Sequence, residues 1–190
     1  MEVDVTDLDV MDSAAGGYES LGRLLRYPDE TFHERLATCR SRVEQVDPKA
    51  SEEVEQFAEG VEGLSLEQLQ ELSTRTFDLN PVCSLEVGWQ LFGEEYSRGT
   101  FLVAMRNLLR ENGIKESVEL PDHLTHILPL LDRLEDTERV EFNDTFLKPA
   151  LTKMLAAFEG KKTAYVHVLR ACDAMLLHSK AMTPAEVTHG

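Results

Sequence analysis

The chain has 190 residues, of which 42% are hydrophobic and 28% charged, as expected for one globular domain with its own core. Its 35 acidic and 19 basic residues give a formal net charge of -16, and residues 1–95 alone hold 22 acids against 7 bases. Such a chain repels phosphate groups, so we expect no nucleic-acid partner. A basic peptide is the better electrostatic match, although an acidic face that serves only solubility is an equal alternative.

The cysteines and the N-terminus indicate where the chain works. The three cysteines (Cys39, Cys83, Cys172) lie far apart and show no C-x-x-C spacing, so we expect neither a disulfide framework nor a zinc site. Residues 1–12 hold five acids and no base, the opposite of a secretory signal, and no uncharged apolar run approaches the roughly 18 residues of a membrane span. We therefore expect a soluble protein of the cytoplasm with no stable membrane insertion.

The first half of the chain predicts helices in series. Apolar residues recur at helical spacing from Tyr18, and Tyr27-Pro28-Asp29 ends that pattern and starts the next. Ser65 and Gln68 form the capping box of a later helix that runs towards Phe77. The expected helices cover residues 18–25, 30–43, 51–61 and 65–77.

Residues 82–93 fit two patterns. Val82, Leu85, Val87, Trp89 and Leu91 partly alternate as a strand would, whereas other apolar residues of the segment share a helical stripe. We favour a short helix, because every neighbouring segment is helical and a lone strand has nothing to pair with.

The second half predicts further helices. Residues 96–112 carry the clearest apolar stripe and are expected near the centre of the core. Pro121 is expected to open the next helix, and residues 142–158 and 163–179 to form two more, the first kinked at Pro149. The sequence therefore predicts an all-α, single-domain bundle of about eight or nine helices. We expect a flexible acidic leader (1–13), the helical domain (14–181) and a frayed tail (182–190).

The segment from Glu119 to Leu124 places two carboxylates and an imidazole within a few residues of one another. Asp122, His123 and His126, with Glu119, invite a metal site, but no fourth ligand follows at a recognisable spacing, so we expect neither metal nor cofactor. A small hydrolase that uses a His123/Asp122 pair is the alternative function, although no G-x-S-x-G, Walker A or H-E-x-x-H motif supports it. An ordinary acidic helix start is the simplest interpretation.

Aromatic residues gather just before and within the expected helix 96–112. Trp89, Phe92, Tyr96 and Phe101 lie within thirteen residues of chain and would either line an apolar groove for a partner helix or fill the core.

Five motifs in order resemble the TorD/DmsD/NarJ family of molybdoenzyme assembly chaperones, most closely its NarJ-like branch. The resemblance covers about residues 18–135. The motifs are Tyr27-Pro28-Asp29, Thr76-Phe77-Asp78, Leu91-Phe92-Gly93-Glu94, Arg98-Gly99 and Glu119-Leu120-Pro121-Asp122-His123-Leu124.

The resemblance implies a TorD-like, all-helical cytoplasmic chaperone and not an enzyme. It would bind the N-terminal leader, often a twin-arginine signal, or the apo form of the catalytic subunit of a molybdopterin-dependent oxidoreductase. It would assist cofactor insertion, with cofactor-insertion proteins as further partners, and hold the subunit until export or membrane assembly. It would carry no cofactor and act as a monomer or dimer.

The resemblance also implies a set of client-binding residues. The residues of the Glu-x-Pro-Asp-His region would bind the client or act as a hinge. The substitution Asp122→Ala would weaken leader capture in a chaperone but abolish turnover in a hydrolase. The four residues of that region are Glu119, Pro121, Asp122 and His123. The further candidates are Asp78, Trp89, Phe92, Glu94, Tyr96 and Arg98.

Overall fold

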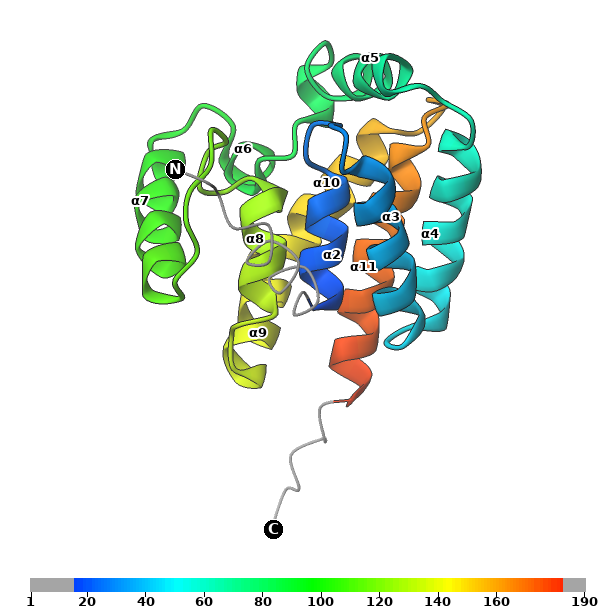
Figure 1. Ribbon diagram of the computed structural model, residues 1–190. Coiled ribbons are helices and arrows are strands. Elements are labelled where there is room, and N and C mark those ends of the chain that lie inside the picture. The colour runs from blue at the N-terminus through cyan, green and yellow to red at the C-terminus, as the bar shows by residue number, and fades with distance from the viewer. Residues whose placement is uncertain (1–15, 183–190) are drawn as a thin grey trace, which may run out of the picture.

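The computed structural model describes residues 16–182, and within that range the predicted all-α class is confirmed (Figure 1). The predicted leader (1–13) and all but the first residue of the predicted tail (182–190) lie outside the described residues. The helices are α2 (Gly17–Leu24), α3 (Phe32–Glu44), α4 (Pro48–Val61), α5 (Leu66–Thr76), α6 (Val87–Phe92), α7 (Tyr96–Glu111), α8 (Leu124–Leu131), α9 (Asp136–Phe142), α10 (Lys148–Ala157) and α11 (Tyr165–Met182). Two short segments join them, the 3₁₀ turn η1 (Pro81–Cys83) and the π-helical η2 (Asn143–Leu147).

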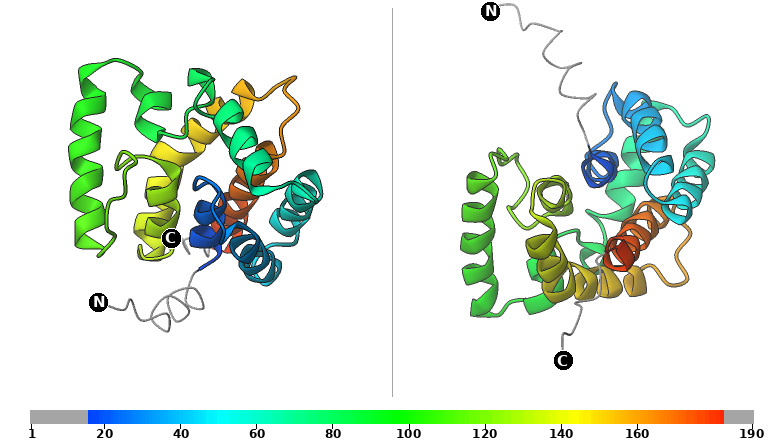
Figure 2. Two further views of the ribbon diagram at one scale, coloured as in Figure 1. Left: turned by 45° about the horizontal axis from the view of Figure 1, so that its top comes forward. Right: turned by 90° about the horizontal axis from the view of Figure 1, so that it is seen from below.

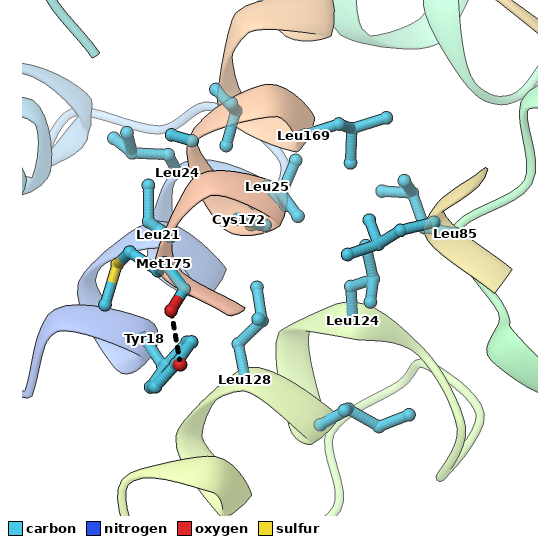
Figure 3. Packing of buried hydrophobic residues seen from close by; sticks show 14 of the residues in the cluster. Tyr18, Leu21, Leu24, Leu25, Leu85, Leu124, Leu128, Leu169, Cys172 and Met175 are labelled. Carbon is cyan, nitrogen blue, oxygen red and sulfur yellow. Dashed lines mark hydrogen bonds between the residues drawn. The ribbon is translucent and has the colours of Figure 1, made fainter. Parts of the chain in front are cut away.

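The core forms around α2, which packs against α8, α3 and α11, while α4 packs against both α3 and α11 (Figures 1 and 2). Leu21, Leu128 and Cys172 are fully buried in this core, which Figure 3 shows from close by. The Tyr18 hydroxyl donates to the Met175 carbonyl at 3.2 Å, so the one polar atom of that ring is satisfied. Segments from both ends of the chain therefore share one core.

Aromatic rings fill the other end of the core. Tyr165, the first residue of α11, packs against Phe57 and Phe77 with ring centroids 5.3 and 4.9 Å apart, and Phe77 also meets Phe158 edge-on at 6.3 Å. These separations are typical of stabilising aromatic pairs. The cluster holds the C-terminal end of α5 against α10 and α11.

Side-chain capping contacts fix the N-termini of α4 and α5. The predicted capping box is present, because Ser65 accepts from the Gln68 N–H and the Gln68 side chain accepts from the Ser65 N–H. The helix predicted from residue 51 begins earlier, at Pro48, since Asp47 accepts from the Ala50 N–H and Pro48 takes the first helical position.

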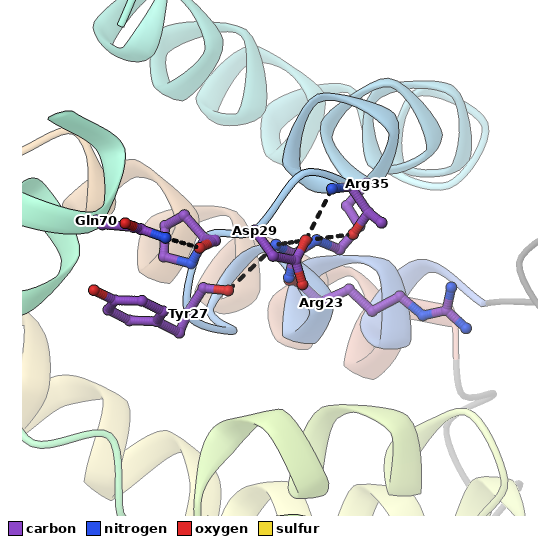
Figure 4. A network of polar contacts seen from close by, with 7 residues as sticks. Arg23, Tyr27, Asp29, Arg35 and Gln70 are labelled. Atoms are coloured by element: carbon purple, nitrogen blue, oxygen red, sulfur yellow. Dashed lines mark hydrogen bonds and ion pairs between the residues drawn. The ribbon is translucent and has the colours of Figure 1, made fainter. Parts of the chain in front are cut away.

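A polar network fixes the turn between α2 and α3 (Figure 4). The Arg35 guanidinium donates to the Arg23 carbonyl at 2.9 Å and to the Asp29 carboxylate at 3.2 Å, and the Gln70 amide donates to the Pro28 carbonyl at 3.0 Å. Because Arg35 is buried, these bonds offset the desolvation of its charge. The turn is thus anchored to α5 as well as to its own helices, and Tyr27 remains more than half exposed.

Three sequence predictions in the second half are wrong in detail. The helix expected from Pro121 begins at Leu124, because residues 121–122 form a turn. The helix 96–112 has the predicted bounds within a residue but lies at the edge of the molecule, not at its centre (Figure 1). The segment 142–158 is divided between the end of α9, η2 and α10, since Pro149 has no N–H with which to continue one helix.

We predict that Leu128→Ala destabilises the fold by about 2–5 kcal/mol, because it empties a fully buried site between α2 and α8. Urea unfolding followed by circular dichroism measures this. Val118→Ala is the matched control, because Val118 is 99% exposed and its truncation removes no packing. Equal midpoints for the two variants would contradict the packing described here.

Candidate functional site

Two segments distant in the sequence are joined by a short backbone pairing. The Val87 N–H donates to the Asp122 carbonyl at 2.9 Å and the Leu124 N–H to the Leu85 carbonyl at 3.1 Å, so Glu86 and His123 form an antiparallel bridge. α6 and α8 each begin directly after this bridge. The segment 82–93 thus contains the favoured short helix, and its alternating pattern reflects the extended residues that precede that helix.

Asp122 is fully buried beneath the start of α6. Its Oδ2 accepts from the Gly88 N–H at 2.8 Å, and a Cβ at position 88 would lie only 2.7 Å from that oxygen, so the contact requires glycine. Burial raises the pKa of the Asp122 carboxyl, although the Gly88 N–H and the charge of Arg98 oppose the rise. Asp122 therefore holds two segments together from inside the fold.

His123 is the N-cap of α8. Its Nδ1 accepts from the Thr125 N–H at 3.3 Å and lies 2.8 Å from the Thr125 hydroxyl, and the ring is 8% exposed. Burial lowers the pKa of His123 to about 4, although the charge of Glu86 opposes the fall. No hydrogen bond joins His123 to Asp122: Asp122 Oδ2 accepts from Gly88, Asp122 Oδ1 is buried without a partner among the described residues, and His123 Nδ1 faces Thr125, so the pair lacks the geometry of a catalytic dyad.

His126 clamps the loop that precedes α8. Its Nε2 accepts from the Ser117 N–H and its Nδ1 lies on the Leu120 carbonyl, both at 2.9 Å. Because Nε2 accepts, Nδ1 carries the ring proton and donates it to Leu120. Both ring nitrogens are occupied, and across residues 16–182 no group of three or more His, Cys, Asp and Glu side chains has the arrangement of a metal site.

Glu119 lies between the two anchors of this clamp and faces outward. Burial raises the pKa of Glu119, the neighbouring carboxylates of Glu86 and Asp78 raise it further, and His126 lowers it. The Ser84 hydroxyl donates to Glu86 and holds that side chain in place. Asp78, Glu86 and Glu119, which come from three separate parts of the chain, therefore form one acidic cluster.

Exposed apolar side chains adjoin the acidic cluster. Leu79 is 74% exposed beside Asp78, Leu120 is 41% exposed beside Glu119, and Val82 of η1 is 58% exposed. Much of the apolar area of these three side chains therefore remains in contact with water. The surface thus combines negative charge with apolar contact area.

The other predicted site residues lie outside the acidic cluster, apart from Asp78. The Arg98 guanidinium lies over the Trp89 ring, 5.1 Å from its centroid, and Phe92 packs against Phe101 at 5.5 Å. Glu94 and Tyr96 are exposed, and no contact in the described chain joins either to the cluster. Pro121 is buried in the turn before the bridge. The client-binding role of all ten predicted residues stays a prediction.

Three residues of this region were missed in the sequence. Glu86 follows no motif, and only the fold brings it to Glu119. Gly88 and Thr125 look ordinary in the chain, because their importance lies in a close backbone approach and a cap that involve residues 122 and 123. The alternation around Leu85 was the only usable signal.

The described residues form an all-helical bundle in which the Asp122 carboxylate and the Gly88 N–H are joined beneath a surface that carries acidic and apolar side chains. The comparisons identify the family: the model of the nitrate reductase delta subunit family matches residues 44–171, so the chain belongs to that family. The Bacillus subtilis (strain 168) protein named "Probable nitrate reductase molybdenum cofactor assembly chaperone NarJ" is 27% identical over 162 residues, which cover 75% of this chain and 88% of that protein. The NarJ-like resemblance and the expectation of a non-enzyme are confirmed.

A helix that spans a membrane must be both long and apolar. Within residues 16–182 no helix combines the length and the apolarity needed to span a membrane.

We predict that Asp122→Ala destabilises the fold by about 1–3 kcal/mol, because the buried Gly88 N–H loses its acceptor. Asp122→Asn is the matched control, since its amide oxygen keeps that bond and its side chain keeps the volume. Urea unfolding of both variants at neutral pH measures the difference. Similar midpoints for the two would show that the hydrogen bond to Gly88 contributes nothing.

We predict that His123 makes the fold lose stability as the pH falls from about 6.5 towards 4. The folded state keeps His123 neutral, so its contribution is present above the pKa of the unfolded chain and disappears through the lowered folded pKa of about 4. His123→Asn keeps a capping side chain without that titration. Unfolding free energies of both proteins across this range should converge at low pH, and parallel curves would contradict the burial of a neutral ring.

Proposed function

We propose that this chain is a cytoplasmic assembly chaperone for the catalytic subunit of a molybdenum-containing oxidoreductase, such as a nitrate reductase. It binds the N-terminal leader of that subunit, assists cofactor insertion, and holds the subunit until export or membrane assembly. Membership of the nitrate reductase delta subunit family and the name of the Bacillus subtilis relative support the general role. The acidic cluster supports the binding of a leader.

The observation that carries the proposal is the repulsion stored in the cluster of Asp78, Glu86 and Glu119. Because burial and the two neighbouring carboxylates raise the pKa of Glu119, its ionised form is less stable in the free protein than that of an isolated carboxylate. A guanidinium or ammonium placed among the three carboxylates relieves that repulsion and gains charge-assisted hydrogen bonds. A basic leader therefore binds at the cluster, where the carboxylates of the free protein repel one another.

The apolar rim extends this recognition beyond charge. Leu79, Val82 and Leu120 offer contact area to the hydrophobic stretch that follows the basic residues of a leader. Burial of this stretch supplies most of the affinity, whereas the carboxylates steer the peptide and set its direction.

Asp122, His123 and His126 act in this proposal as positioning residues. The Asp122 carbonyl fixes the backbone next to Glu86, the His123 cap starts α8, and His126 holds Ser117 and Leu120 on either side of Glu119. Their effect on binding passes through the placement of Glu86 and Glu119.

We predict that Glu119→Gln weakens leader binding about fivefold, which corresponds to about 1 kcal/mol for one partly exposed ion pair. Combining it with Glu86→Gln and Asp78→Asn should weaken binding further. Calorimetry of each protein against the synthetic leader of the oxidoreductase subunit measures this. Thermal midpoints should stay unchanged or rise, because the substitutions remove mutual repulsion.

The control is Glu138→Gln, which removes an exposed charge from α9, at the opposite end of the molecule from η1 (Figure 1). It removes one negative charge, as Glu119→Gln does, but leaves the cluster intact. If both variants weaken leader binding equally, the effect is due to net charge and not to the acidic cluster. Leader binding that survives the triple substitution would overturn the proposed site.

A further inference from the structure

A second charged region, of opposite sign, lies between α4, α5 and the start of α11. It is a hollow of about 600 Å³ whose lining contains no aspartate or glutamate. Its polar lining includes Arg75, Lys161, Lys162, His167 and Arg170. We call it the basic pocket. In a chain with 35 acids and 19 bases, four Lys and Arg line this one hollow, and the carboxylates that border it, Glu53 and Glu59, are held by His167 and Gln56.

Three cations of the basic pocket lack a counter-charge from the fold. Arg75, Lys162 and Arg170 are exposed, and none of them makes an ion pair with another described residue. The other two basic groups are engaged: Lys161 donates to the Cys83 sulfur at 3.3 Å, and His167 lies 2.7 Å from the Glu53 carboxylate. The uncompensated cations are therefore free to hold an acidic ligand.

We propose that the basic pocket binds the acidic N-terminal segment of the same chain. Residues 2–12 carry Glu2, Asp4, Asp7, Asp9 and Asp12 and no base, so they form the most uniformly acidic stretch of the sequence. Their carboxylates are attracted by the cations of the pocket and repelled by the carboxylates of the acidic cluster. The segment and the pocket are therefore complementary in charge.

The segment is long enough to reach. The described chain starts beside α11, where a side chain on Gly17 would meet Met175. His167 of the basic pocket lies about 12 Å away along that helix, at about 1.5 Å per residue. Passing around a helix of about 10 Å diameter roughly doubles the path. The chain from Gly16 to Glu2 spans up to about 45 Å when extended, so Glu2, Asp4 and Asp7 all reach the pocket.

Tethering makes weak contacts sufficient. Exposed ion pairs are individually weak, so a free peptide of this kind is expected to bind only at about millimolar concentration. A tether of this length supplies an effective concentration of a few millimolar, which keeps the pocket occupied most of the time at low salt. Occupancy should fall as salt shortens the Debye length to about 3 Å at 1 M.

Acetylation of lysines in the full-length protein tests the proposal. The variant replaces Glu2 by Gln and Asp4, Asp7, Asp9 and Asp12 by Asn, which neutralises the segment without shortening it. At about 20 mM salt we expect Lys162 to react about threefold to fivefold more slowly in the natural chain than in the variant, in line with the occupancy above. Lys49, an exposed residue of α4 outside the pocket, is the internal control and should react equally in both proteins.

The outcomes separate the possible occupants. Loss of the difference at about 1 M salt supports the proposal. Equal Lys162 rates at low salt overturn it. Protection that grows with protein concentration replaces it by exchange of segments between two copies. If millimolar inorganic phosphate protects Lys162 equally in both proteins while the segment does not, the pocket serves small anions and the proposal is wrong.

Discussion

The backbone bridge between Glu86 and His123 is the constraint on which the site depends. It joins two segments that the chain separates by the whole of α6 and α7, and it sets the residue at which α6 and α8 begin. Its hydrogen bonds are reinforced by the Asp122 side chain, which accepts from the next N–H along the partner segment. Because Glu86 is itself part of the bridge and Glu119 lies one turn before it, the acidic cluster follows directly from this pairing.

Burial divides the ionisable groups of this region into two kinds. Asp122 and His123 are inside, and desolvation disfavours the charged form of each, so their value lies in the hydrogen bonds that they make. Glu119 and Asp78 are outside, where their charges remain available to a ligand. One short motif therefore supplies both the anchors and the surface. In the proposed function only the exposed members of this motif meet a ligand, and the buried ones position them.

Much of the fold follows from local sequence, whereas the site does not. The capping box at Ser65 and the apolar stripe of residues 96–111 are local signals, and both produced the predicted helices. The position of α7 at the edge, and the start of α8 at Leu124, depend on what packs against them, which periodicity does not contain. The meeting of Glu86 with Glu119 likewise requires the bridge; the alternation around Leu85 indicates extended residues there but not the segment with which they pair.

Net charge alone also misdescribes the surface. A formal charge of -16 predicts repulsion of every anion, yet the end of α5 separates surfaces of opposite sign: Asp78 follows it in the acidic cluster, and Arg75 on its last turn lines the basic pocket. Thr76 lies between them and is held to the start of α11 by its hydroxyl, 3.0 Å from that of Thr163. The end of α5 therefore fixes the position of the acidic cluster relative to the basic pocket, whatever each of them binds.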